Sequence, residues 1–191
     1  MSSKEIADRL RQQATARFDF LRYKTGGSFE PRLDLTATAR REPQFFFSAD
    51  SVPQLCARMK ERLPGEADQI IERAERICEH RFDLLGYGDV DYGPEIDWHL
   101  DRVHGKRAPR KPWFKIRYLD FEEVGDSKVT WEINRHQHLV TLAKAFRLTG
   151  HAKYSTELFR QWKHWHRENP YPIGVNWSSS LEVAFRSLSW L

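Results

Sequence analysis

Two stretches in the last third of the chain hold side chains that could do chemistry. The first is Trp131–Leu139, with the sequence WEINRHQHL, and the second is Gly174–Ala184, with the sequence GVNWSSSLEVA. Both place charged, amide and aromatic side chains where a helix that only packs would carry leucine and alanine. Such groups either satisfy one another inside the fold or reach a ligand, and their spacing bears on that choice.

The first stretch lies in a helix that the hydrophobic periodicity predicts over residues 127–148. Glu132 and His136 are four residues apart and fall inside its apolar face, so their side chains can meet. Charged groups on a packing face are costly unless they are paired. Two interpretations stay open: Glu132 and His136 satisfy each other or partners on neighbouring helices inside the core, or the face lines a cleft where the pair reaches a substrate. Asn134 and Arg135 project around the rest of this helix, either into solvent or along the end of a groove.

The second stretch opens a helix that is predicted to begin near Asn176 and to continue to Leu191. Glu182 and Arg186 are four residues apart beside its apolar stripe, which predicts a surface ion pair worth roughly 0.3–0.5 kcal/mol. Asn176 either caps the helix or helps to bind an anion, such as the carboxylate of an acidic sugar. The apolar stripe is expected to contain Trp177, Leu181, Ala184, Phe185, Leu188 and Leu191.

The remaining sequence is typical of helical hairpins with irregular connections. Helices are expected over residues 4–22, 51–63, 66–80 and 152–168, and no strand pattern of comparable strength is present. Residues 23–50 and 81–126 are punctuated by Gly and Pro and are expected to be irregular. The sequence therefore predicts an all-α fold of antiparallel helix hairpins. An N-terminal helix and irregular segment would occupy residues 1–50, and the main body residues 51–191.

Composition indicates a globular chain with a mild excess of positive charge. The 191 residues are 40% hydrophobic and 30% charged, with a net charge of +4 and a sequence pI of about 9.1. The basic clusters Arg40-Arg41 and 106–111 are either solvated loops or sites for an anionic partner, acidic glycan or nucleic acid. No apolar run is long enough for a membrane span. No signal peptide is visible, so a cytoplasmic location is expected if Met1 is the native start; otherwise a periplasmic one stays open.

Neither the cysteines nor the histidines suggest a metal site. Cys56 and Cys78 show no metal-ligand spacing and are expected to be packing residues. His136 and His138 are two residues apart and would point in different directions on a helix, so they are not expected to share a metal. The sequence therefore predicts no metal and no cofactor.

Several of these motifs together resemble those of one protein family. They are VTWEINRHQHLV at 129–140, the helix hairpin around Thr149-Gly150 and Tyr154, and GVNWSSSLEVAFRSLSW at 174–190. The segments FDLLG at 82–86 and DWH at 97–99 also fit the pattern. Over about residues 80–191 the chain resembles the N-terminal domain of bacterial heparinase II/III-like polysaccharide lyases.

The resemblance implies an (α/α) toroid of helix hairpins, of which this chain would be the incomplete front part, followed by a β-sandwich domain. It also implies cleavage of uronic-acid polysaccharides, such as heparan sulfate or alginate, by β-elimination. In that reaction an Asn neutralises the uronate carboxylate, and Tyr or His groups take the C5 proton and serve the leaving oxygen. The family's catalytic Asn lies in an Asn-Asn-His-like segment. This chain has no Asn-His pair, so the catalytic set is expected beyond it and the fragment alone is expected to be inactive.

The resemblance suggests an acidic polysaccharide as partner and eight residues on the cleft side. They are Glu132, Asn134, Arg135, His136, Asn176, Trp177, Glu182 and Arg186. Their expected roles are carboxylate or sulfate contact, sugar stacking by Trp177, and orientation by Glu132 and Glu182. The alternative is a non-catalytic helical module that binds glycan or protein, or a truncated inactive product. A nucleic-acid binder rests only on the positive charge and lacks a recognised reading motif, so it is not expected.

Overall fold

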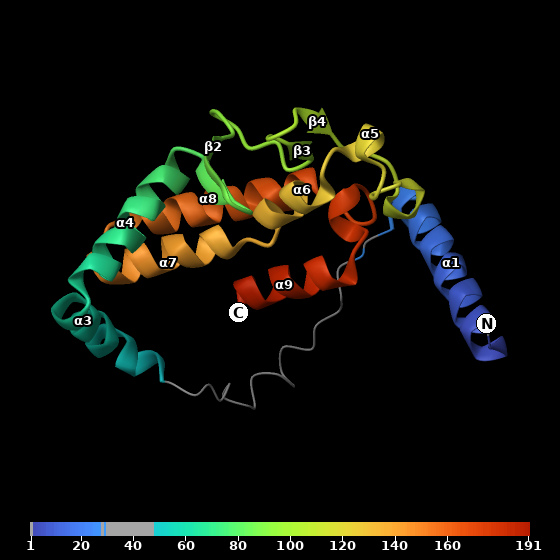
Figure 1. Ribbon diagram of the computed structural model, residues 1–191. Helices are drawn as coiled ribbons and strands as arrows, with labels where there is room; N and C mark the ends of the chain where they lie inside the picture. The colour runs from blue at the N-terminus through green and yellow to red at the C-terminus, as the bar shows by residue number, and fades with distance from the viewer. Residues whose placement is uncertain (1, 28, 30–47) are drawn as a thin grey trace.

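The computed structural model describes residues 2–27, 29 and 48–191, which fold mainly into α-helices (Figure 1). The all-α class predicted from the sequence is confirmed. The basic pair Arg40-Arg41, and most of the segment predicted to be irregular at 23–50, lie outside the described residues. None of the described helices is both long and apolar enough to cross a lipid bilayer.

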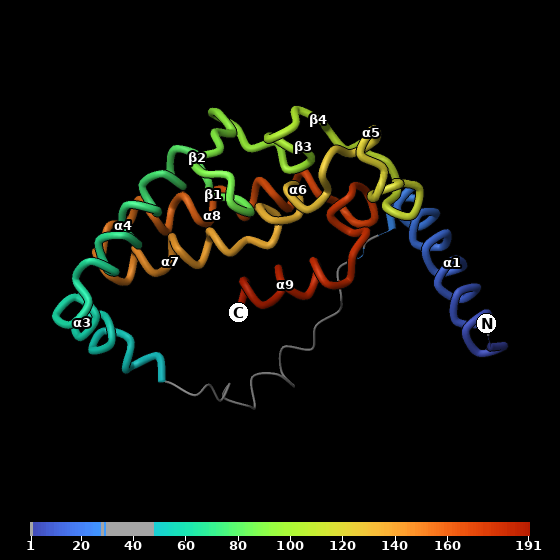
Figure 2. The backbone as a smooth tube through the Cα atoms, in the orientation of Figure 1, coloured from blue at the N-terminus to red at the C-terminus, as the bar shows by residue number. Residues whose placement is uncertain are grey.

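Three neighbouring helices form the body of the molecule, as the backbone tube in Figure 2 shows. They are α4 (Pro64–Cys78), α7 (Gln137–Thr149) and α8 (Ala152–Glu168), and α3 (Val52–Arg62) packs against α4 and α7. The turn between α7 and α8 uses Gly150 at φ 73°, a left-handed helix end that glycine adopts without strain. The core between these helices contains Ala74, Ile77, Leu139, Leu142, Ala145, Tyr154 and Trp165.

The connection from α4 to α6 (Ser127–Asn134) contains two short β-hairpins that were not predicted from the sequence. β1 (Arg81–Leu84) pairs antiparallel with β2 (Tyr87–Asp91), and β3 (Leu100–Asp101) with β4 (Lys106–Arg107). Leu85 and Gly86 both have positive φ, 51° and 90°, as a tight two-residue hairpin turn requires. Strands of two to five residues are too short for an alternating pattern to stand out, so the expectation of a wholly irregular segment was wrong here.

The second half of this connection is organised around one buried carboxylate, that of Asp101. It accepts hydrogen bonds from the backbone N–H groups of Val103, His104 and Asp126, at 2.7–3.1 Å. These bonds replace the water that the carboxylate loses on burial. The start of α6 is thereby held against β3, and the short helix α5 (Phe121–Val124) packs against β4.

Helix α1 (Ser3–Lys24) projects from one end of the body (Figure 1). The hydroxyl of Tyr171 donates to the carboxylate of Asp19 at 2.6 Å and ties the helix to the segment after α8. The predicted amphipathic helix is present, but most of its apolar residues stay exposed, among them Ile6, Leu10 and Phe18. Two single-turn 3₁₀ helices are also present. η1 (Ala49–Ser51) directly precedes α3, and η2 (Trp113–Lys115) lies between β4 and α5.

The helix predicted over residues 127–148 is broken into two. α6 (Ser127–Asn134) ends before Arg135, and α7 begins at Gln137. His136, between them, has φ 62° in the left-handed region, which changes the direction of the chain. Glu132 and His136 therefore do not pair with each other: Glu132 accepts from Arg135, and His136 accepts from the indole of Trp190. The alternative of a partner on a neighbouring helix inside the core holds for His136, which is buried.

The last helix begins later than predicted, and the face that it buries is not the predicted apolar stripe. A 3₁₀ turn, η3 (Val175–Trp177), precedes α9 (Ser180–Trp190), so Asn176 lies outside the α-helix and does not cap it. Glu182 and Arg186 are the buried residues of α9, so the predicted surface ion pair was wrong. The expected apolar stripe is largely exposed, at Leu181, Leu188 and Leu191.

Candidate functional site

The eight residues predicted to bind substrate come together where the break between α6 and α7 meets η3 and α9. Three of them, Glu132, Arg135 and Trp177, are half-buried. The cluster is therefore an internal polar network with one open edge. The other five residues are buried, with exposed fractions of 0–3%: Asn134, His136, Asn176, Glu182 and Arg186.

Arg186 is the central cation of this network. Its guanidinium lies over two neighbouring indole rings, with Cζ 4.4 Å from the ring centroid of Trp165 and 5.3 Å from that of Trp177. Nη1 donates to the backbone carbonyl of Asn134 at 3.1 Å, and Nη2 to that of Asn176 at 3.0 Å. Burial lowers the pKa of Arg186 to about 10, so the side chain stays charged at neutral pH. The two carbonyls and the two rings stabilise a cation that has lost its water.

Asn134 and Asn176 fasten the loop that carries Trp98 to the helices. Both amides donate to the Trp98 carbonyl, at 2.9 and 3.2 Å. Asn134 also accepts from the indole N–H of Trp165 at 2.6 Å, and Asn176 donates to the side chain of Asn169 at 2.7 Å. The two amides thus join α6, η3, α8 and the loop at one buried point.

His136 is held as a neutral ring. The indole of Trp190 donates to its Nδ1 at 2.8 Å, and because an indole nitrogen only donates, Nε2 must carry the imidazole proton. That Nε2 is buried and has no hydrogen-bond partner among the described residues. Burial, and then the neighbouring His138 and Arg186, lower the pKa of His136 well below its usual value. The ring is therefore placed to orient α9 rather than to exchange protons with solvent.

Arg135 forms the open edge of the cluster. Nε and Nη2 donate to the carboxylate of Glu182 at 2.6 and 2.9 Å, and Nη1 donates to Glu132 at 2.6 Å. The hydrogen bonds to Glu182, followed by the attraction of both carboxylates, raise the pKa of Arg135. Its positive charge is thereby balanced by two negative ones, and the guanidinium also lies over the ring of Phe185. The edge can form hydrogen bonds with the hydroxyl groups of a sugar, but it carries no net positive charge.

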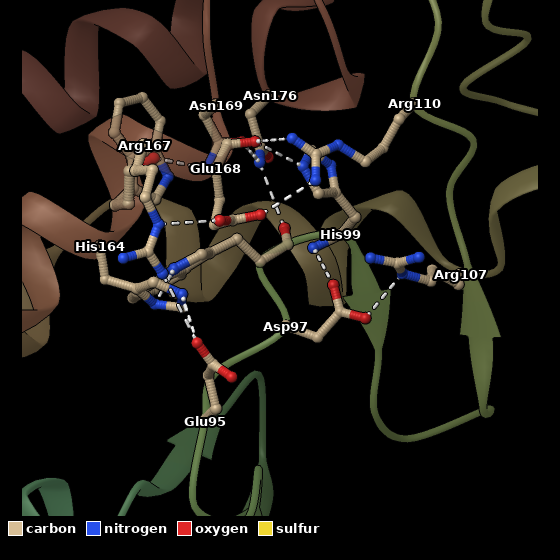
Figure 3. A network of polar contacts seen from close by, with 12 residues as sticks. Glu95, Asp97, His99, Arg107, Arg110, His164, Arg167, Glu168, Asn169 and Asn176 are labelled. Atoms are coloured by element: carbon tan, nitrogen blue, oxygen red, sulfur yellow. Dashed lines mark hydrogen bonds and ion pairs between the residues drawn. The ribbon is translucent and has the colours of Figure 1, made fainter.

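The loop around Trp98 also lines a surface cleft of about 320 Å³, whose polar network Figure 3 shows. Trp98 Nε1 donates to His164 Nδ1 at 3.0 Å, so His164 directs Nε2–H toward Glu95, 3.1 Å away. Asp97 pairs with Arg107 at 2.7 Å. Glu95 and Glu168 could not be singled out from the sequence, whereas the segment at 97–99 and the basic cluster at 106–111, which contains Arg107, both lie at this cleft.

The floor of this cleft depends on the close approach of His99 to Gly174. Gly174 has φ 103° and ψ 163°, a conformation essentially restricted to glycine, and a Cβ there would lie 2.6 Å from His99 Cε1. His99 is buried, and its Nε2 bonds to the Glu168 carbonyl at 3.2 Å. Burial is the main cause that lowers the pKa of His99.

We expect Gly174→Ala to lower the free energy of unfolding by about 3 kcal/mol, through strain and displacement of the His99 ring. Gly105→Ala is the matched control, because Gly105 also has positive φ (68°) but has open space around it. It should cost only about 1 kcal/mol. Urea denaturation of both variants measures the difference, and equal losses would show that the contact with His99 is unimportant.

Within the described residues, no group of three or more His, Cys, Asp and Glu side chains is arranged to hold a metal ion. Cys56 and Cys78 are free thiols, both half-buried, and Cys78 packs against the core. Burial raises the pKa of the Cys78 thiol to about 11. A thiol with a raised pKa is a poor nucleophile.

Comparison with known families identifies the chain. A model described as heparinase II/III N-terminus matches residues 5–190. The chain belongs to this family, and the resemblance noted from its motifs is confirmed.

Two curated relatives agree with this assignment. A heparin-sulfate lyase of Pedobacter heparinus is 29% identical over 100 residues, which is 52% of this chain and 12% of the relative. A heparin-sulfate lyase of Bacteroides stercoris is 28% identical over 99 residues, 51% of this chain and 12% of the relative. The chain is thus related to polysaccharide lyases, although the matched stretch is about an eighth of their length. No solved structure matches the chain.

Proposed function

We propose that this chain is the front part of a polysaccharide lyase that cleaves uronic-acid glycans, of the heparan sulfate or alginate type, by β-elimination. The observation that carries the proposal is the family match over residues 5–190, together with relatives named heparin-sulfate lyases. In the proposal the helix hairpins form the first part of an (α/α) toroid, at residues 51–191. The catalytic Asn, Tyr and His set lies in sequence beyond this chain.

The eight predicted site residues take two roles in this proposal. Glu132, Arg135 and Trp177 are half-buried, and they are the ones placed to contact a sugar. The five buried residues hold these three in position through the hydrogen bonds around Arg186 and the Trp98 carbonyl. A site whose supporting residues are locked by packing and hydrogen bonds keeps its geometry when the substrate binds.

The reaction itself needs groups that abstract a proton and stabilise an enolate. Removal of the C5 proton from a uronate becomes feasible when hydrogen-bond donors neutralise the carboxylate, because the developing charge is then stabilised. A base takes that proton and an acid protonates the leaving glycosidic oxygen. His136 is a poor candidate for either role because it is buried and its pKa is lowered.

The test is an elimination assay on the intact protein that carries this chain. Heparan sulfate, alginate and neutral dextran are supplied separately, and the conjugated double bond of the unsaturated uronate product is followed by ultraviolet absorbance. Absorbance that rises with an acidic glycan and not with dextran supports the proposal. Binding of acidic glycan without any unsaturated product would overturn it in favour of a non-catalytic binding module.

A further inference from the structure

A pocket of about 380 Å³ lies beside the predicted cluster. Glu132, which accepts a hydrogen bond from Arg135 of the cluster, also lines this pocket. Its walls come from the end of α4, from β1, and from the junction of α6 and α7. Glu132 is the one predicted site residue that lines it. The pocket is large enough to hold a sugar unit, and nothing in the sequence analysis pointed to it.

One wall of the pocket carries three arginines, two of which are already paired with carboxylates. Arg76 binds Asp83 through both terminal nitrogens, at 2.9 and 2.7 Å, which leaves its buried Nε–H with no partner among the described residues. Arg81 is paired with Glu79 and Asp89. Arg73, one turn before Arg76 on α4, is exposed and forms no ion pair or side-chain hydrogen bond with the described residues. The exposed guanidinium of Arg73 is therefore available to an incoming anion.

The opposite wall and the floor suit the rest of a sugar. Gln137 and Thr141 line the pocket, and neither side chain makes a hydrogen bond with the described residues. The floor is apolar and includes Phe82 and Ile133. Sugars offer hydroxyl groups on their edges and C–H groups on their faces. The amide of Gln137, the hydroxyl of Thr141 and the apolar floor therefore complement a sugar ring whose acidic group faces the arginine wall.

We propose that this pocket binds the acidic group of a saccharide unit, with Arg73 holding its carboxylate or sulfate oxygens. Gln137 and Glu132 contact the hydroxyl groups of the same unit. The inference rests on the proposed function for the nature of the glycan and adds a binding site outside the predicted cluster. Charge-assisted hydrogen bonds from guanidinium groups are the usual means of recognising both kinds of oxyanion.

The test measures binding of a heparin-derived tetrasaccharide to the intact protein by calorimetry, with Arg73→Ala as the main variant. Loss of one charge-assisted contact should weaken binding about tenfold. Arg58→Ala is the matched control: Arg58 is also exposed, on α3, forms no ion pair with the described residues and does not line the pocket. It should bind as the unmodified protein does. Equal affinities of the Arg73→Ala and Arg58→Ala variants would overturn the proposal.

Three ligands separate the sources of the acidic group. An alginate-derived tetrasaccharide carries carboxylates only, and the heparin-derived one carries sulfates as well. An Arg73-dependent affinity for both supports recognition of the carboxylate, and one for the heparin fragment alone supports recognition of the sulfate. Neutral dextran that binds as tightly as either would contradict the proposal.

The outcome is independent of the elimination assay. A protein that forms unsaturated uronate but binds glycan equally well with and without Arg73 keeps the proposed function and loses this pocket. A protein that shows Arg73-dependent binding but no elimination loses the proposed function and keeps the pocket.

Discussion

Replacing Arg186 with alanine should lower the free energy of unfolding by about 4 kcal/mol, because two buried acceptors lose a charged donor. The carbonyls of Asn134 and Asn176 would remain inside the protein without the guanidinium that they now accept from. The rings of Trp165 and Trp177 would also lose the cation that lies over them. A loss of packing adds to the unmade hydrogen bonds, while release of the buried charge offsets part of the cost.

Urea denaturation followed by tryptophan fluorescence measures this effect, with Arg58→Ala as a charge-matched control on the exposed side of α3. The control should stay within about 0.5 kcal/mol of the unmodified chain. Arg186→Lys should recover only part of the loss, because an ammonium group lacks the planar fork that lies over the indole rings and reaches both carbonyls. If Arg186→Ala were as stable as the control, Arg186 would not be the centre of the network.

The helices could be predicted from the sequence because their signals are local. The periodicity of apolar residues, Pro53 in the first turn of α3 and Gly150 at the end of α7 are all read within a few positions of the element they define. The eight site residues could be gathered for a similar reason, since each belongs to one of two short segments.

The burial of α9 could not be predicted in the same way, because its cause is not local. Counting leucines places Leu181 and Leu188 inside, whereas the structure buries Arg186 instead. That choice depends on two indole rings and two carbonyls supplied by α8, α6 and η3, which no pattern within α9 reveals. A polar residue inside a helix stripe is correctly judged costly, and only the fold shows what compensates the cost.

The break at His136 has the same origin. A run of residues with good helical periodicity predicts one helix over 127–148. The structure instead places His136 in a left-handed conformation, where its ring contacts those of Trp165 and Trp190. Tertiary contacts of this kind outweigh local propensity, which spans less than about 1 kcal/mol per residue for most side chains.

Stability should fall steeply as the pH is lowered from about 6.5 to 4, because several buried histidines are neutral in the folded chain. Burial lowers the pKa of His138 from 6.5, the usual value for histidine, to about 4. Burial also lowers the pKa of His136 and His99. The unfolded chain therefore takes up protons that the folded chain refuses in this window. The stabilisation is complete above the usual histidine pKa, is lost as the pH falls, and levels off for His138 below about 4.

The share of His138 can be isolated with His138→Gln, which removes the titrating ring and keeps a polar side chain. A shift from 6.5 to about 4 corresponds to about 3 kcal/mol of pH-dependent stability. When urea denaturation is repeated across the same pH range, the free energy of unfolding of the variant should therefore fall by about 3 kcal/mol less than that of the unmodified chain. His151→Gln is the control, because His151 is exposed at the start of α8 and should leave the slope unchanged. A slope that His138→Gln leaves intact would mean that His138 already accepts its proton in the folded chain, and that the acid sensitivity arises from other groups.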